Sequence, residues 1–118
     1  MAKYVPRLDL DRLVAIDVHT HAEVSSRAPR DPCSIILDEA KAKYFKESAR
    51  PTIPEVAQYY RERNMAAVIF PVDTESEAGI WRIANEEVAE LAAENADVLI
   101  PFASIDPAKG KMGVREAR

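Results

Sequence analysis

The two histidines of the chain, His19 and His21, are separated by one residue at the end of the apolar segment LVAIDVHTHAEV. Residues 13–20 mix Val and Ile with alternating polar positions, which predicts a buried β-strand. Side chains two positions apart on a strand point the same way, with Cα atoms about 6.5–7 Å apart. Both imidazoles can therefore reach one cation, since zinc binds histidine nitrogen at about 2.0–2.1 Å. Spacing alone does not select the metal, because imidazole suits several first-row ions.

A three-residue pattern is also common by chance, and the two histidines are then unrelated polar side chains satisfied by backbone groups or water. Strict alternation places Ala15 and Asp17 on the face of the histidines. Ile16, Val18 and Thr20 then share the opposite, more apolar face. A polar face on a buried strand is costly unless its groups are paired, and a cation is one suitable partner. Asp17 fits two roles equally well, support for the metal ligands or a hydrogen-bonded carboxylate of its own.

Three helices are predicted from apolar periodicity and capping residues. A threonine is followed by glutamate three residues later at Thr52 and again at Thr74, which is the spacing of a capping box. Apolar side chains recur at helical intervals after each pair, and an asparagine stands where each helix can end. These patterns predict a helix over 51–64 and a long amphipathic helix over 74–95. A shorter helix is predicted over 34–48, carried on a long irregular connection.

Two further strands are predicted at 65–72 and 98–105, where short runs are almost wholly apolar. A turn after the last strand leads into the opening of another helix. Strands that alternate with helices are typical of right-handed parallel units, whose functional groups gather at the carboxyl ends of the strands. Asp73, Ser104 and Asp106 join the histidines at this end of the predicted sheet. Both aspartates precede a turn or helix, so capping is the favoured interpretation for each.

Composition indicates one small α/β domain over residues 1–118, because the chain is 47% hydrophobic and has material for a single core. The net charge of -4 is spread along the sequence without a basic stripe, which argues against nucleic acid as a partner. The charged first residues do not resemble a signal peptide, and no apolar run is long enough to span a bilayer. We therefore expect a soluble cytoplasmic protein without membrane contact. The single cysteine, Cys33, cannot form an internal disulfide and is interpreted as an ordinary loop thiol.

Three segments resemble the start of the amidohydrolase-related family (amidohydrolase 2), which includes aminocarboxymuconate semialdehyde decarboxylase: AIDVHTHAEV, MAAVIFPVD and ANEEVAELAAENADVLIPFASIDPAKG. The resemblance runs from about Leu13 to the end of the chain. It implies the N-terminal part of a (β/α)8 TIM barrel, with about three parallel strands and their helices. It also implies that His19 and His21 bind a divalent metal, zinc or manganese. The implied reaction is hydrolysis or decarboxylation of a small carboxylic acid, under an active-site loop over residues 22–50.

The chain also departs from this family. A complete barrel takes about 250 residues, so the chain supplies roughly two and a half of the eight units. The family's further histidine ligand and its aspartate acid–base group match no residue here, and the catalytic residues stay unassigned. We therefore expect the N-terminal segment of a metal-dependent hydrolase or decarboxylase whose active site is incomplete. It would form a homo-oligomer or pair with the missing barrel portion. Two alternatives are a non-catalytic α/β interaction or assembly module derived from the same barrel, and a domain that binds an acidic metabolite without turnover.

Overall fold

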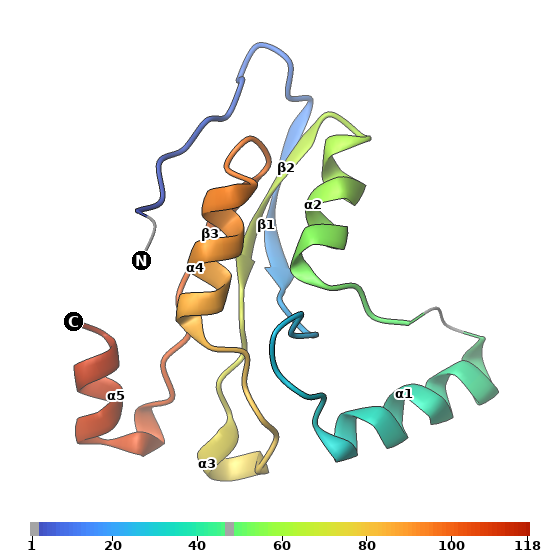
Figure 1. The fold of residues 1–118 in the computed structure, drawn as a ribbon, viewed down its shortest axis with the longest axis vertical. Coiled ribbons are helices and arrows are strands. Elements are labelled where there is room, and N and C mark those ends of the chain that lie inside the picture. Colours follow the sequence, from blue (N-terminus) through green and yellow to red (C-terminus); the bar gives the residue numbers. More distant parts are fainter. Residues whose placement is uncertain (1–2, 47–48) are drawn as a thin grey trace.

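A three-stranded parallel sheet forms the centre of the computed structural model, which describes residues 3–46 and 49–118 (Figure 1). Strands β1 (Ala15–His21), β2 (Met65–Phe70) and β3 (Leu99–Pro101) lie in the order β1-β2-β3. Both neighbouring pairs are parallel. This arrangement confirms the predicted α/β fold with parallel strands connected through helices, and it is compatible with part of a barrel.

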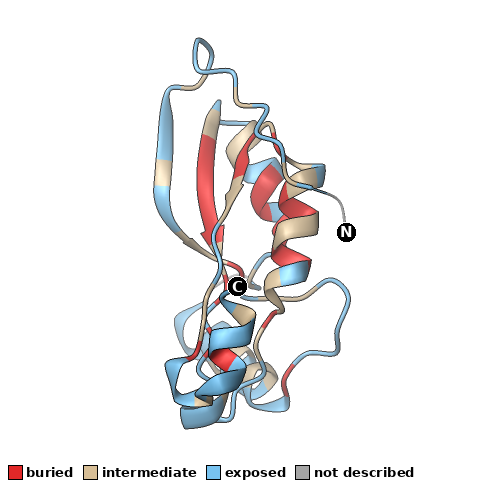
Figure 2. Cartoon of the chain, turned by 90° about the vertical axis from the view of Figure 1, so that its left-hand side faces the viewer, coloured by how far each residue is buried: buried red, intermediate tan, exposed pale blue. Residues whose placement is uncertain are grey.

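Helices α2 (Ile53–Arg61) and α4 (Asn85–Glu94) cover one face of the sheet, as Figure 2 shows. Helix α2 begins where predicted, because the Glu55 carboxylate accepts the Thr52 backbone N–H at 2.7 Å. Both helices turn their apolar stripes toward the strands, and this burial is the main stabilising contribution to the fold. The core cluster consists of Ala22, Ile53, Val56, Ala57, Ala67, Ile69, Ile83, Val88, Leu91, Ala92, Val98 and Leu99.

The long helix predicted over 74–95 is wrong, because the chain forms two helices there. Helix α3 (Glu75–Ala78) ends at Gly79, whose φ of 64° lies in the left-handed region that favours glycine. The threonine ahead of α3 makes no side-chain capping bond. Trp81 and Arg82 therefore lie in the connection to α4 and not within a helix. The Asp31 carboxylate accepts the Trp81 backbone N–H at 2.8 Å, so a distant residue holds this connection in its non-helical form.

Strand β3 covers only the first part of the predicted strand over 98–105. Beyond it, the Asn85 side chain replaces a neighbouring strand as hydrogen-bond partner. Its amide oxygen accepts the Ser104 N–H at 2.9 Å, and its amide nitrogen donates to the Ser104 carbonyl at 2.8 Å. Both backbone groups of Ser104 are thus satisfied by a side chain of α4.

The other predicted helices are confirmed. Helix α1 (Pro32–Phe45) is carried on the long connection after β1, and residues 47–48 of the predicted helix lie outside the described residues. Cys33 lies in the first turn of α1 and is exposed, which corrects its assignment to a loop. The segment after β3 forms the short 3-10 helix η1 (Pro107–Lys109) and helix α5 (Lys111–Glu116). None of the described helices combines the length and apolar character that crossing a membrane requires.

Candidate metal centre

Strand β1 contains a β-bulge that includes the first histidine. Val18 and His19 together stand opposite a single residue of β2, because the register shifts between Asp17 and Thr20. The β2 partners of Asp17 and Thr20 belong to the buried core, so these two side chains lie on the helix-covered face. Strict alternation was therefore the wrong expectation, since Asp17 does not share the face of the histidines. The strand is also not buried as predicted, because Val18 is 73% exposed at the edge of the sheet.

The polar groups of the bulge are satisfied locally and by α2. The Asp17 carboxylate accepts the His19 backbone N–H at 3.0 Å and the Tyr60 hydroxyl at 2.7 Å. The Thr20 hydroxyl donates to the Val68 carbonyl at 2.7 Å. The Tyr60 hydroxyl, followed by the His19 N–H, lowers the pKa of Asp17 from its ordinary value. Burial, together with the Asp17 carboxylate, raises the pKa of Tyr60 to about 12. The hydrogen-bonded carboxylate, one of the two roles considered for Asp17, is observed.

The rings of His19 and His21 converge at the carboxyl end of β1. Their Nε2 atoms lie 2.9 Å apart and their ring centroids 4.9 Å apart. The Phe70 ring packs beside both, with centroids 5.5 Å from His19 and 4.8 Å from His21. His19 is exposed and His21 is half-buried, so both nitrogens remain accessible from solvent. The strand thus brings together the two side chains that sequence spacing singled out.

The geometry of this pair fits two adjacent positions around one metal ion. With metal–nitrogen distances near 2.1 Å, two ligand nitrogens lie about 3.0 Å apart at a right angle and about 3.4 Å apart at a tetrahedral angle. The observed 2.9 Å is close to the right-angle value. Two imidazole lone pairs at this distance repel unless a proton or a cation lies between them. Within residues 3–46 and 49–118, no third His, Cys, Asp or Glu joins the pair in a metal-binding group.

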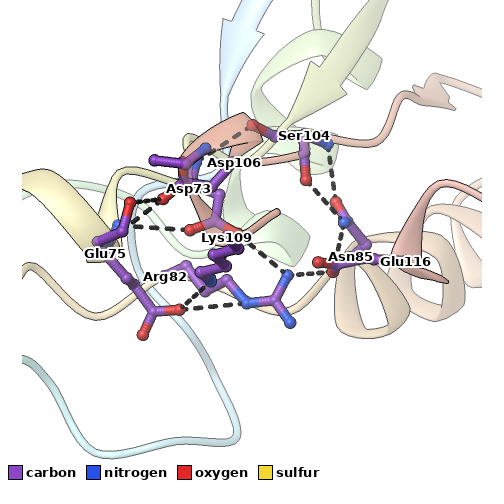
Figure 3. Close-up of polar contacts among 10 residues, drawn as sticks. Asp73, Glu75, Arg82, Asn85, Ser104, Asp106, Lys109 and Glu116 are labelled. Atoms are coloured by element: carbon purple, nitrogen blue, oxygen red, sulfur yellow. Dashed lines mark hydrogen bonds and ion pairs between the residues drawn. The ribbon is translucent and has the colours of Figure 1, made fainter. Parts of the chain in front are cut away.

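The aspartates at the ends of β2 and β3 are engaged by other groups of the chain. Asp106 accepts the Ala108 N–H at 2.9 Å and caps η1, which confirms the capping interpretation. Asp73 also accepts the Glu75 N–H at the start of α3, at 3.4 Å, and its side chain is in addition fully buried among cations. The Lys109 ammonium donates to it at 2.9 Å, and the Arg82 guanidinium lies 3.5 Å away (Figure 3). These carboxylates are therefore not available beside the histidine pair.

Further acidic groups join the same two cations. Glu75 lies 3.3 Å from Arg82 and 3.0 Å from Lys109, and Glu116 pairs with Arg82. Arg82 and then Asn85 lower the pKa of Glu116 through hydrogen bonds. The polar layer, as we call this network, joins segments that are remote in sequence. Apolar periodicity in the sequence could not predict this network, because no local pattern pairs these side chains. The polar layer comprises Asp73, Glu75, Arg82, Lys109 and Glu116.

A small cationic cavity opens beside the end of β1. Its volume is about 100 Å³, and its lining includes Arg30, Arg50 and Trp81, as well as Glu23, which follows the second histidine by two residues. One carboxylate, Asp38, serves both lining arginines, at 2.5 Å from Arg30 and 2.8 Å from Arg50. Glu23 and Asp31 line the same cavity, so carboxylates accompany the two guanidinium groups that could bind an anionic ligand. Sequence reasoning treated this segment only as a covering loop and missed the two arginines.

Comparisons of the chain with protein-family models, with curated proteins and with solved structures found no match. Function is therefore inferred from the histidine pair and the groups around it. Three features bear on that inference: convergent imidazole nitrogens, their place at the carboxyl end of a parallel strand, and the adjoining cationic cavity.

Proposed function

We propose that the chain is the N-terminal part of a metal-dependent amidohydrolase-type barrel enzyme, in which His19 and His21 supply two metal ligands. The observation that carries this proposal is the 2.9 Å separation of the two Nε2 atoms at the carboxyl end of β1. In α/β barrels the reacting groups gather at this end of the strands. The three parallel strands of the sheet would then be the first three of eight.

A bound zinc or manganese ion would act as a Lewis acid on a substrate oxygen or on water. His19 and His21 would bind it through the Nε2 atoms that converge at the end of β1. Phe70 packs beside both rings and limits their rotation. The remaining ligands and an acid–base group would come from outside the described residues, as the resemblance implies.

The cationic cavity supports a carboxylic acid as the substrate. Arg30 and Arg50 share one carboxylate partner, Asp38, and their guanidinium groups could hold a substrate carboxylate through paired hydrogen bonds. The cavity holds about 100 Å³, which fits a carboxylate and a few further atoms but not a macromolecule. We therefore propose hydrolysis or decarboxylation of a small carboxylic acid, with the acid group held near the arginines and the reacting group near the histidines.

Metal binding by the purified protein tests this proposal. Zn²⁺ affinity is measured by competition with a chromophoric chelator, and the visible spectrum of the Co²⁺ form reports nitrogen ligation. His19→Ala and His21→Ala should each lower the affinity by about tenfold or more, because each removes one of two ligands. Cys33→Ser is the matched control, since this exposed thiol is another potential ligand and lies in α1. Equal affinity in the wild type and both histidine variants, or no bound metal at all, would overturn the proposal.

The exposed surface supports a second candidate, an interaction or assembly module. Val14 and Val18 of the β1 edge are 74% and 73% exposed. The accessible surface is 7943 Å², whereas a compact monomer of 13.2 kDa exposes about 6,400 Å². The excess is comparable to the total area of a standard protein–protein interface, about 1,600 Å². A homo-oligomer measured by light scattering, dissociated by Val18→Lys and indifferent to metal, would favour this candidate over the enzyme.

A further inference from the structure

Asp17 links the histidine strand to helix α2. One carboxylate oxygen accepts the backbone N–H of His19 at 3.0 Å, and the other accepts the hydroxyl of Tyr60 at 2.7 Å. Tyr60 is 43 residues away in sequence and packs against the hydrophobic core. The carboxylate thus joins a metal-ligand candidate to the best-buried part of the molecule, on the opposite face of the sheet.

We propose that Asp17 and Tyr60 are positioning residues of the metal site, which hold the β-bulge that places the His19 and His21 rings beside Phe70, on the face of the sheet opposite α2. This inference rests on the proposed function, because it assigns a purpose to the placement of the two rings. Neither residue would touch the metal. Both act through the backbone of His19, which Asp17 binds directly and Tyr60 binds through Asp17.

Side chains of a regular strand alternate between its two faces. In a regular strand, residues two apart share a face, so Asp17 would lie on the same face as His19. That arrangement would either separate Asp17 from Tyr60 or turn His19 toward the helix-covered face. The extra residue in the bulge removes the conflict, because the strand regains its register at Thr20 after one additional position.

A bulge leaves backbone groups without ladder partners, and each unpaired buried group is costly. Asp17 takes up the His19 N–H, and Thr20 donates its hydroxyl to the Val68 carbonyl of the neighbouring strand. Side chains in and beside the bulge therefore replace the acceptor and the donor that a regular ladder would supply. Without the acceptor at Asp17, the regular register becomes relatively more favourable, and both imidazoles then leave Phe70 for the face of Asp17, which α2 covers.

Tyr60 connects the Asp17 carboxylate to the hydrophobic core. It follows Val56 and Ala57 on α2, and both of these side chains are buried between the helix and the sheet. The Tyr60 ring packs against the same cluster, so the hydroxyl that binds Asp17 has little freedom to move. Core packing behind the sheet thus determines the orientation of a ligand in front of it.

Tyr60→Phe tests the inference with a minimal change, because it deletes the hydroxyl and retains the ring. Tyr59→Phe is the matched control, since Tyr59 is its neighbour on α2 and is exposed. Asp17→Asn keeps an oxygen that can accept the His19 N–H, whereas Asp17→Ala removes it. Three quantities are measured for each variant: Zn²⁺ affinity, the nuclear Overhauser effect between the His19 and Phe70 rings, and hydrogen exchange of the His19 amide.

We expect Asp17→Ala to lower Zn²⁺ affinity by about tenfold or more and Tyr60→Phe by a smaller factor, with the control unchanged. Asp17→Asn should retain most of the His19 amide protection that Asp17→Ala loses. Unchanged affinity, ring contact and amide protection in Tyr60→Phe would overturn the inference, even if Asp17→Ala fails to fold. Absence of metal binding in the wild type would contradict the proposed function alone, because ring contact and amide exchange still test the positioning role.

Discussion

Two regions of the molecule are held together by different forces. Behind the sheet, α2 and α4 press aliphatic side chains against the strands, and Ile69 and Leu99 are completely buried. Beyond the carboxyl ends of β2 and β3, α3 buries no side chain and α5 buries only Gly113. The polar layer connects these elements through ion pairs (Figure 3). Ion pairs thus hold together the end of the sheet where functional groups would lie. Apolar packing holds together the sheet and the helices that support it.

This contrast implies different responses to solution conditions. Burying one aliphatic side chain completely contributes about 1.5–3 kcal/mol, and salt hardly changes that contribution. Exposed ion pairs contribute about 0–1 kcal/mol each and weaken as salt screens them. Asp73 is the exception within the polar layer, because its carboxylate is fully buried and depends on its two cations. The polar layer should therefore loosen before the core does.

The largest effect should come from the core. Leu99→Ala removes a completely buried side chain between the sheet and α4, and it should lower the free energy of unfolding by about 2–5 kcal/mol. Urea denaturation followed by far-UV circular dichroism measures this loss, which should be the same at low and high salt. Val114→Ala, an exposed position on α5, is the control and should change stability by less than about 0.5 kcal/mol. A strongly salt-dependent loss for Leu99→Ala would refute the division into two regions.

Removing the buried carboxylate of the polar layer should have the next largest effect. Asp73→Asn removes the buried partner that Lys109 and Arg82 share and leaves them paired with Glu75 at the surface, and these side chains are 18% and 23% exposed. Breaking a fully buried pair costs about 3–5 kcal/mol, so partial exposure of the cations reduces the expected loss to about 1–3 kcal/mol. Hydrogen exchange should accelerate in α3 and α5 and remain slow in β2. Glu77→Gln, an exposed acidic position on α3, is the control. Uniform acceleration throughout the chain would show one cooperative unit instead.

Acid should loosen the polar layer through Glu116, whose pKa Arg82 holds below the ordinary value of 4.5. A carboxyl with a lowered pKa in the folded state stabilises the fold above pH 4.5, and this contribution is lost as the pH falls through the lowered pKa. Trp81, the single tryptophan, lies in the α3–α4 connection next to Arg82 and can report the change by fluorescence. Its transition should precede the loss of circular dichroism. Arg82→Gln should move the transition to higher pH, and coincident transitions would contradict the prediction.

The same division separates what the sequence could predict from what it could not. Apolar periodicity is local, and it predicted α2, β2 and the helix-covered core because each stripe must be buried. The polar layer depends on contacts such as Lys109 with Asp73, 36 residues apart, which no window of the sequence reveals. The break at Gly79 was missed for a related reason, since a hydrogen bond from Trp81 to Asp31 competes with helix formation.

The candidate site was predicted in part. Strand spacing alone placed His19 and His21 together, and their nitrogens do converge. The face of Asp17 was wrong because the bulge depends on Tyr60, a residue of another element, and on a hydroxyl bond from Thr20 to β2. Strict alternation contains no information on such partners. Side-chain spacing thus identified which residues meet, but long-range hydrogen bonds decided how the strand presents them.

The smallest effect should come from the glycine that separates the two halves of the predicted long helix. Gly79 has a φ of 64°, and a Cβ built there would meet no atom within 4 Å. Gly79→Ala should therefore cost only the left-handed backbone conformation, about 1 kcal/mol. Gly79→Asn should cost less, because asparagine tolerates this conformation better. If Gly79→Ala instead gains helical circular dichroism without losing stability, the long helix predicted over 74–95 would be accessible, and the contact between Trp81 and Asp31 would be too weak to enforce the break.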